Sequence, residues 1–250
     1  MFLEIEKPER LRIDYSILGQ GPDMVFIHGG ASNHYEYKKL LSELSKYYKV
    51  YAFTMPGFAK SEKLRNYSLE KYFEALEEVI NKLNLDSFIL AGHSFGAGKA
   101  SWYAYKHPEK VRKLILISPL LSPLAKNPLR IWNDIRKSIK QGHRLAKTKP
   151  KKTFVKRIIP FDLQNLPYIL KVLSGANEID LRDRLKDIKI PTLAFVSDND
   201  LVIPHSKQMK DLEFIPHVKI IIQHSGHSHK SDIEKIVVDI AQFDNSSEQE

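Results

Sequence analysis

The fold of this chain is decided by the stretch Phe88-Ile89-Leu90-Ala91-Gly92-His93-Ser94-Phe95-Gly96-Ala97-Gly98. An apolar strand runs into the pattern G-x-S-x-G, and small residues that suit a helix follow. Such a turn strains its central serine, so that the hydroxyl stands above the sheet. Glycines two positions before and after let helix and strand approach closely, and Gly92 and Gly96 occupy these positions. The stretch therefore predicts a nucleophile elbow with Ser94 at its tip.

Strand and helix patterns alternate on both sides of this turn. Apolar or alternating runs predict strands at 11–18, 24–27, 50–53, 113–117, 191–196 and 218–222, and helical patterns cover 35–46, 68–83, 204–213 and 229–242. This alternation predicts an α/β fold, with a mostly parallel central sheet, helices on both faces, and reactive groups at the carboxyl ends of the strands. The alternation stops between about 119 and 186. We expect a core of residues 1–118 and 187–250 and an inserted helical lid at 119–186.

Length and composition narrow the class of protein. A chain of 250 residues that is 42% hydrophobic can bury a sizeable core. No apolar run reaches the ~18 residues of a membrane-spanning helix, and the first residues lack a signal-peptide pattern, so we expect a cytoplasmic protein without a transmembrane segment. The absence of cysteine excludes disulfides and thiolate nucleophiles. No metal or cofactor is expected, because the histidines near residue 227 lack the carboxylate spacing of H-E-x-x-H.

The positive charge is concentrated in the predicted lid. The net charge is +9, and between Lys126 and Arg157 there are 12 lysines or arginines and one acid, Asp134. The remainder of the chain therefore sums to about −2. A solvated helix surface explains this segment most simply, and attraction of an anionic substrate or membrane surface is the second explanation. Nucleic acid is not an expected partner, because no nucleic-acid-binding motif accompanies the charge.

A serine hydroxyl needs a base to accept its proton and a third group to orient that base. The candidates follow buried strands: Asp198 and Asp200 for the acid, and His224, His227 and His229 for the base. Gly226 favours His227, since a glycine fits a loop that passes close to the end of the sheet. The chain order of serine, acid and histidine is that of one particular fold.

These motifs together resemble the α/β-hydrolase fold superfamily, in its lid-bearing, single-domain branch of serine hydrolases. The matching segments, in order, are His28-Gly29-Gly30, Pro56-Gly57-Phe58, Gly92-His93-Ser94-Phe95-Gly96, Asp200 with Pro204, and Gly226-His227. The chain departs from the usual pattern at three places. Relatives usually have Asp before the Pro-Gly, where this chain has Thr54-Met55, and Gly after the Phe, where it has Ala59. They also usually have Gly at the position of Ser197. The departures affect loops and leave the proposed catalytic groups in place.

The resemblance implies a role for each matching residue. Ser94 would be the nucleophile, His227 the general base and then acid, and Asp200, four residues before Pro204, the orienting acid. The backbone N–H groups of Gly30 and Phe95 would form the oxyanion hole. Lid residues would supply the substrate pocket, and the candidates are Trp132, Phe154, Ile158, Phe161 and Tyr168.

We therefore expect a serine hydrolase that cleaves a carboxylic ester through an acyl-enzyme at Ser94. The expected substrate is a small-molecule ester with an apolar acyl or aryl part, which could carry a negative charge. Amide, thioester or carbon–carbon bond cleavage remains an alternative with the same residues. A member of this fold that binds a ligand with little or no turnover is an alternative of a different class.

Overall fold

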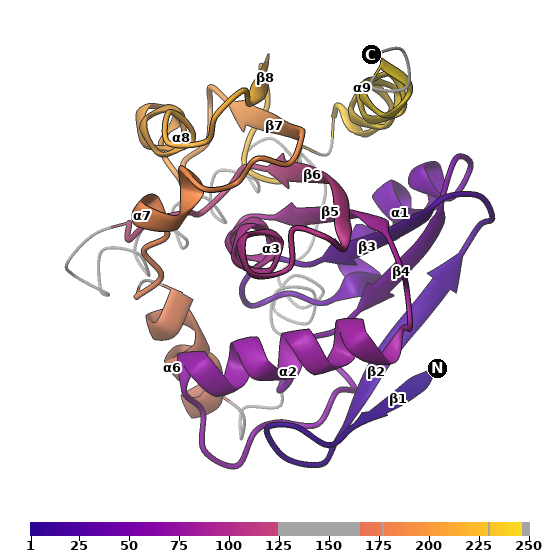
Figure 1. Cartoon of the computed structure of the whole chain (residues 1–250). Coiled ribbons are helices and arrows are strands. Elements are labelled where there is room, and N and C mark those ends of the chain that lie inside the picture. The colour runs from indigo at the N-terminus through magenta and orange to yellow at the C-terminus, as the bar shows by residue number, and fades with distance from the viewer. Residues whose placement is uncertain (125–165, 177, 230, 247–250) are drawn as a thin grey trace, which may run out of the picture.

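A single mixed sheet organises the chain. The computed structural model describes residues 1–124, 166–176, 178–229 and 231–246. Its sheet has the order β1-β2-β4-β3-β5-β6-β7-β8 (Figure 1). The strands are β1 (Phe2–Ile5), β2 (Leu11–Leu18), β3 (Asp23–Ile27), β4 (Lys49–Phe53), β5 (Phe88–His93), β6 (Val111–Ile117), β7 (Thr192–Ser197) and β8 (Lys219–Gln223). From β4 to β8 in this order the pairs are parallel, whereas β1 and β2 add antiparallel pairs.

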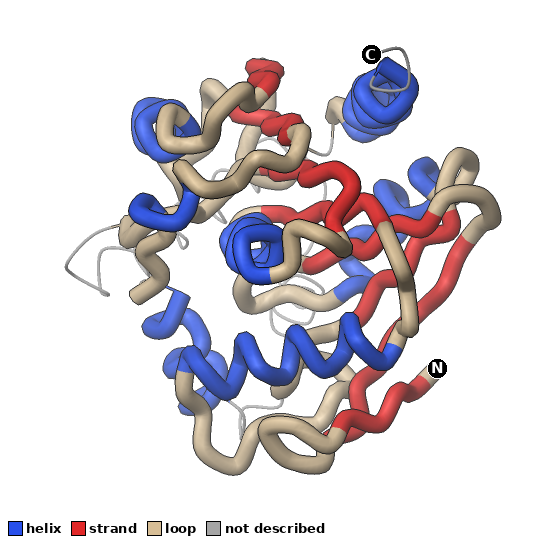
Figure 2. The backbone as a smooth tube through the Cα atoms, in the orientation of Figure 1, coloured by secondary structure: helices blue, strands red, loops and turns tan. Residues whose placement is uncertain are grey.

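Helices cover both faces of the sheet (Figure 2). One face packs against α1 (Lys38–Leu44) and α9 (Ile233–Asn245), and the other against α2 (Leu69–Lys82), α3 (Phe95–Lys106) and α8 (His205–Leu212). The short 3-10 helix η1 (His34–Tyr37) precedes α1, and α6 (Leu166–Ala176) and α7 (Arg182–Leu185) precede β7. The predicted α/β fold with a mostly parallel sheet is confirmed.

The sheet is parallel because its central strands are apolar on both faces. All residues of β5 and β7 are buried, as are four of the five residues of β3. Parallel strands with helices on both faces bury both of their surfaces, and they read as continuous apolar runs in sequence. The edge strand β1 was not predicted, since its four residues alternate between exposed and buried positions without a long apolar run.

The order of the strands places two loops beside one reversal of that order. From β3 the chain crosses to β4 on one side, and from α2 it returns to β5 on the other side of β3. In α/β proteins, ligands bind beyond the carboxyl ends of the strands at such a reversal. Gly29 and Gly30 follow β3, and Ser94 follows β5, so both segments lie at this reversal of the strand order.

Glycine is required at two positions of the predicted elbow because backbones meet there. A Cβ atom at Gly92 would lie 2.4 Å from the carbonyl oxygen of Gly96, and a Cβ atom at Gly96 would lie 2.2 Å from the carbonyl oxygen of Ile27. Backbone atoms cannot move aside as a flexible side chain can. The close approach of helix and strand expected from G-x-S-x-G is therefore confirmed.

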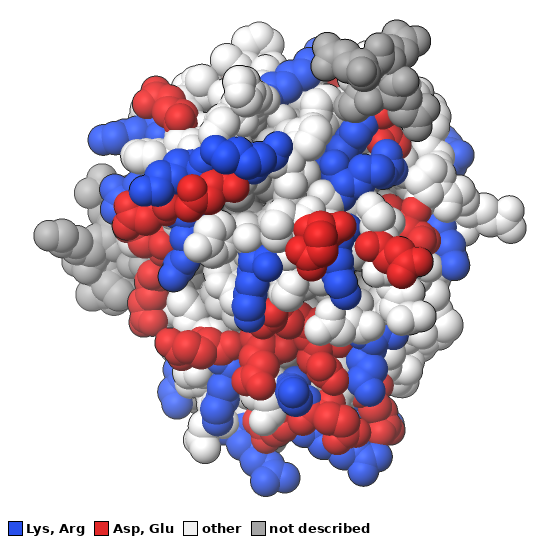
Figure 3. All heavy atoms as spheres, viewed as in Figure 1, with Lys and Arg blue, Asp and Glu red and all other residues white. Residues whose placement is uncertain are grey.

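The surface of the described residues has no single sign of charge on the face shown in Figure 3, where acidic and basic side chains alternate. This agrees with the sum of about −2 outside the basic segment. Residues 126–157 lie outside the described residues, so the lid boundaries at 119–186 stay a prediction. The described ends of this region pack on the core, because Leu121 is buried and its carbonyl accepts a hydrogen bond of 2.9 Å from the N–H of Leu181.

Gly96→Ala should destabilise the protein by about 2 to 4 kcal/mol, because its new methyl group meets backbone at the elbow. Gly226→Ala is the matched control, since no atom lies within 4 Å of the Cβ position there, and its free energy of unfolding should change by less than about 1 kcal/mol. Urea denaturation followed by tryptophan fluorescence measures both. Equal stability of the two variants would contradict the packing described for the elbow.

Candidate active site

Ser94 occupies the turn between β5 and α3 with a strained backbone. Its φ is 57° and its ψ is −121°, in the region that residues with a side chain rarely adopt. Four backbone hydrogen bonds of 2.9 to 3.3 Å hold this residue: its N–H donates to the carbonyl of Ile117, and its carbonyl oxygen accepts from the N–H groups of Ala97, Gly98 and Leu120. The surroundings thus maintain the strain that presents the side chain at the carboxyl end of the sheet.

Asp200 lies in the loop after β7 and is buried with its carboxylate fully used. Oδ1 accepts the N–H groups of Val202 and Ile203 at 2.8 and 2.9 Å. Oδ2 accepts from Nδ1 of His227 at 2.7 Å and from Nε2 of Gln208 at 3.1 Å. Burial raises the pKa of Asp200, but the hydrogen bond and charge of His227, with the two N–H groups, outweigh burial and hold the pKa below its ordinary value. This carboxylate is therefore charged at neutral pH.

In the structure, His227 pairs with Asp200. The other two candidate bases, His224 and His229, have other partners. His224 pairs with Asp198 instead, and the His224 side chain is 89% exposed. His229 is buried, with Nε2 2.7 Å from the hydroxyl of Ser118, and burial followed by the charge of His227 lowers its pKa to about 4. Of the three candidate bases, only His227 combines a buried carboxylate partner with a partly exposed ring.

The structure shows no steric need for glycine before His227. No atom lies within 4 Å of a Cβ built at Gly226. The loop is held by its neighbours instead. The hydroxyl of Ser197, where relatives usually have glycine, donates to the carbonyl of Ser225. The ring of His229 contacts the side chains of Gln223 and Ser225 through Nδ1.

The loop after β3 is fixed by His28. Its ring is buried, with Nδ1 2.7 Å from the carbonyl of Gly29, and Nε2 accepts the N–H of Met55 at 2.9 Å. Burial, and then the charge of Lys99, hold the pKa of His28 well below its ordinary value, so the ring is neutral and has one donor and one acceptor. His28 thereby joins the loops that follow β3 and β4.

Gly30 and Phe95, the predicted oxyanion donors, are neighbours. A Cβ at Gly30 would lie 3.7 Å from Cβ of Phe95 and 3.5 Å from a methyl carbon of Leu173 in α6. Phe95 begins α3, so its N–H has no partner within the helix, and the N–H of Gly30 makes no hydrogen bond to a described residue. Space is tighter at Gly29, where a Cβ would lie 3.3 Å from Cβ of Ser94. Gly30, the predicted oxyanion donor, therefore has more free space around its Cβ position than Gly29.

Of the five predicted lid contacts, four lie outside the described residues: Trp132, Phe154, Ile158 and Phe161. Tyr168 lies in α6 and is buried against the turn after β4. Its hydroxyl donates to the carbonyl of Pro56 at 3.2 Å, and its ring fills the space that a side chain at Gly57 would need. These contacts give Tyr168 a packing role, and its contact with substrate stays a prediction.

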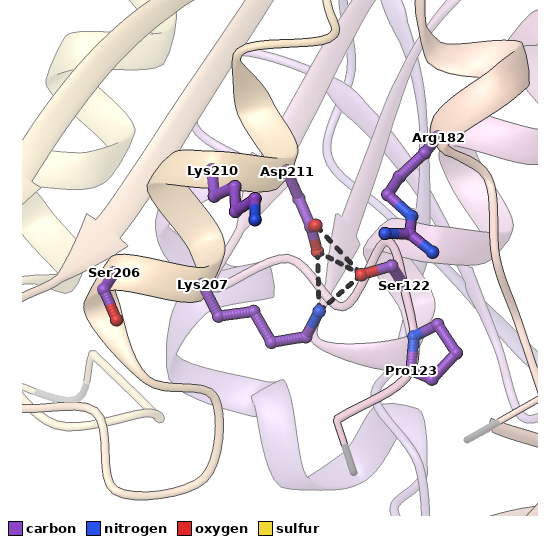
Figure 4. Close-up of a pocket in the computed structure, with 7 residues that line it drawn as sticks. All are labelled: Ser122, Pro123, Arg182, Ser206, Lys207, Lys210 and Asp211. Carbon is purple, nitrogen blue, oxygen red and sulfur yellow. Dashed lines mark hydrogen bonds and ion pairs between the residues drawn. The ribbon is translucent and has the colours of Figure 1, made fainter. Parts of the chain in front are cut away.

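A pocket of about 620 Å³ lies between the segment after β6, α7 and α8 (Figure 4). It is lined by Ser122, Pro123, Arg182, Ser206, Lys207, Lys210 and Asp211. Asp211 accepts the Ser122 hydroxyl at 2.9 Å and pairs with Lys207 at 3.1 Å. Asp211 and Ser122 are buried, so this group anchors the segment after β6 to α8.

Lys99 is a buried cation that sequence reasoning did not single out. Its side chain is inaccessible, and its amine has no hydrogen-bond partner among the described residues. The amine lies 4.7 Å from the ring centre of Phe95 and 5.2 Å from that of Tyr72. Burial lowers the pKa of Lys99 to about 7. The two aromatic faces compensate only part of the cost of burying the charge.

The described residues contain neither a cluster suited to a metal ion nor a helix suited to span a membrane. No group of three or more histidine and acidic side chains in the described part could hold a metal ion. No described helix has the length and hydropathy needed to cross a bilayer.

Comparison with known proteins agrees with this architecture. The alpha/beta hydrolase fold family matches residues 22–145. A pimeloyl-[acyl-carrier protein] methyl ester esterase of Wigglesworthia glossinidia brevipalpis is 27% identical over 76% of this chain and 80% of the relative. The AB hydrolase superfamily protein YisY of Bacillus subtilis is 27% identical over 97% of this chain and 98% of the relative. The chain belongs to the alpha/beta-hydrolase fold superfamily.

A solved structure shows the same fold. The esterase of Exiguobacterium antarcticum superposes with a TM-score of 0.81 over 97% of this chain and 99% of that protein, at 21% sequence identity. The predicted superfamily and fold class are confirmed, and the relatives of low sequence identity include esterases.

Lys99→Met should stabilise the protein by about 2 kcal/mol or more at pH 6, because it removes a buried amine that has no hydrogen-bond partner among the described residues. The folded-state pKa of about 7 lies below the ordinary 10.5, so the unfolded chain binds this proton more tightly. The wild-type protein therefore gains stability as pH rises from about 7 to about 10. The advantage of Lys99→Met should shrink over the same range.

Urea denaturation at pH 6 and pH 9.5 measures this difference. Lys106→Met on the same helix is the control, since Lys106 is exposed and pairs with Glu77 at 2.8 Å. Its effect on the free energy of unfolding should not depend on pH in this range. A constant difference between Lys99→Met and wild type at both pH values would contradict the burial of the amine.

Proposed function

We propose that this protein is a serine hydrolase that cleaves carboxylic esters, with Ser94 as nucleophile, His227 as general base and Asp200 as the orienting acid. The observation that carries the proposal is the 2.7 Å hydrogen bond from Nδ1 of His227 to the buried carboxylate of Asp200. Because Nδ1 donates to the carboxylate, Nε2 of the neutral ring is left as an acceptor. The strained turn that presents Ser94 supports its role as nucleophile.

The reaction follows from these groups. Nε2 of His227 accepts the proton of Ser94 while the serine oxygen attacks the ester carbonyl, and the oxyanion is stabilised by the N–H groups of Gly30 and Phe95. The imidazolium then donates this proton to the leaving alkoxide, which departs as the alcohol. In the second half, His227 accepts a proton from water, the hydroxide attacks the acyl-enzyme, and proton return to Ser94 releases the carboxylic acid.

The relatives support an ester rather than another acyl compound. The Wigglesworthia protein is named as an esterase of a methyl ester, and the present chain has the same superfamily fold. We propose a small ester with an apolar acyl or aryl part as substrate. Amides, thioesters and carbon–carbon bonds would use the same three residues, so a substrate panel must compare them.

One observation favours the second candidate, a ligand-binding protein with little turnover. No hydrogen bond joins the Ser94 hydroxyl to His227 among the contacts of the described residues, so these groups must approach before proton transfer. Catalytic hydrogen bonds are often long in the absence of substrate. Labelling of Ser94 by a fluorophosphonate together with repeated turnover would identify the enzyme, whereas ligand-induced thermal stabilisation without turnover would identify the binder.

Replacing Ser94 or His227 by alanine should lower kcat for p-nitrophenyl butyrate by at least ~10³-fold, because each change removes a group that bonds or transfers the proton. Asp200→Asn should cause a smaller but severe loss, since it removes the charge that stabilises the imidazolium. Asp198→Asn is the matched control and should keep wild-type kcat. Severe loss in Asp198→Asn with normal activity in Asp200→Asn would reverse the assignment of the acid.

If the basic segment 126–157 attracts an anionic substrate, the rate of hydrolysis of a charged ester should depend on the salt concentration. The kcat/KM for a monoester of a dicarboxylic acid should fall several-fold between about 20 mM and about 500 mM salt, because screening weakens the attraction. The uncharged diester of the same acid is the control and should change little. Equal salt dependence of the two esters would leave only the solvated-surface explanation.

A further inference from the structure

Tyr37 and His93, which take no part in the proposed mechanism, connect the three segments that carry Gly30, Ser94 and His227. Tyr37 ends η1, and its ring packs on Phe26 of β3 with ring centres 4.9 Å apart. His93 ends β5 and directly precedes Ser94. The Tyr37 hydroxyl lies 2.7 Å from Nδ1 of His93 and 3.1 Å from the N–H of Gly29. Nε2 of His93 lies 2.7 Å from the carbonyl oxygen of His227.

The direction of every hydrogen bond in this series follows from chemistry. Burial, and then the charge of His227, lower the pKa of His93 to about 3, so its ring is neutral and carries one N–H. A carbonyl oxygen can only accept, so Nε2 of His93 donates to His227 and Nδ1 must accept. The Tyr37 hydroxyl then donates to Nδ1, and its oxygen accepts the N–H of Gly29. Burial raises the pKa of Tyr37, which keeps this hydroxyl protonated.

The atoms of the series surround one point in the fold. A Cβ built at Gly29 would lie 3.1 Å from Nδ1 of His93, 3.2 Å from the hydroxyl of Tyr37 and 3.3 Å from Cβ of Ser94. The rings of His93 and His227 also contact each other, with centres 4.8 Å apart. A shift at any member therefore moves the loop before Gly30, the elbow, or the loop of the base.

We propose that Tyr37 and His93 are positioning residues that hold the Gly29–Gly30 loop, the elbow and the His227 loop in register for catalysis. The inference rests on the proposed function, because the register matters only if Gly30, Ser94 and His227 act on one substrate. Neither side chain needs to touch the substrate. Their contribution is to place an oxyanion donor and the base on opposite sides of the same serine.

The first test removes the hydrogen bonds of Tyr37 and those of His93 in separate variants. Tyr37→Phe removes the acceptor of the Gly29 N–H and the donor to His93. His93→Gln keeps a donor near the Nε2 position but loses the acceptor at Nδ1, and His93→Asn keeps an acceptor near Nδ1 but loses the donor to His227. Each change should lower kcat for p-nitrophenyl butyrate by about 10-fold to 100-fold with less than about a two-fold change in KM, because a displaced oxyanion donor weakens the transition state more than the bound substrate.

A double-mutant cycle tests the connection itself. The hydrogen bond that His93→Gln removes is already absent in Tyr37→Phe, so the double variant should lose no more kcat than Tyr37→Phe alone. Tyr103→Phe is the matched control, since the Tyr103 hydroxyl is buried and has no hydrogen-bond partner among the described residues, and it should keep wild-type kcat. The proposal would be overturned if the loss of kcat in the double variant equalled the product of the two single losses. It would also be overturned if Tyr37→Phe kept as much kcat as Tyr103→Phe.

Labelling distinguishes the failure of this proposal from failure of the proposed function. If wild type is labelled by a fluorophosphonate at Ser94 and turns over, but the Tyr37 and His93 variants react at the wild-type rate, only the positioning role is wrong. If wild type is neither labelled nor active, the proposed function is wrong and the positioning role falls with it. Should Tyr37→Phe fail to fold, the two His93 variants make the same comparison.

Discussion

The structure depends on the contact between backbones at the turn that carries Ser94. Helix α3 lies so close to strand β5 at Gly92, and to the end of strand β3 at Gly96, that no side chain fits at either position. Ser94 has a strained conformation at this turn, and four backbone hydrogen bonds hold it. Because β5 lies at the centre of the sheet, the strained residue stands where the loops after β3, β7 and β8 can reach it.

Four of the histidines near this edge of the sheet, His28, His93, His227 and His229, fall into two kinds according to their surroundings. His28, His93 and His229 are buried among neutral partners, and burial lowers the pKa of each. A neutral imidazole offers one donor and one acceptor with fixed directions, so these three join loops to one another. Of these four, His227 hydrogen-bonds a buried carboxylate, that of Asp200. The same kind of side chain thus joins loops or, in the role proposed for His227, transfers protons, according to its partner.

The loops are also joined by hydroxyl groups. Ser118 bonds His229, Ser197 bonds the carbonyl of Ser225, and the hydroxyl of Tyr37 lies between Gly29 and His93. Ser197 stands where relatives usually have glycine, and its bond links the loop of Asp200 to the loop of His227. The departure from the usual pattern therefore adds a connection beside the site.

The sequence by itself determined the order of strands and helices, the elbow, and the pairing of residue types around it, because these depend on local apolar runs, on glycine at two close contacts and on chain order. The spacing from Pro204 pointed to Asp200 through the resemblance, but only the tertiary structure showed that Asp200 is buried and meets His227 while Asp198 meets His224. It alone revealed Lys99 as a buried amine without a hydrogen-bond partner among the described residues, and Tyr37 as a neighbour of His93, because contacts between residues 56 positions apart leave no periodic signal.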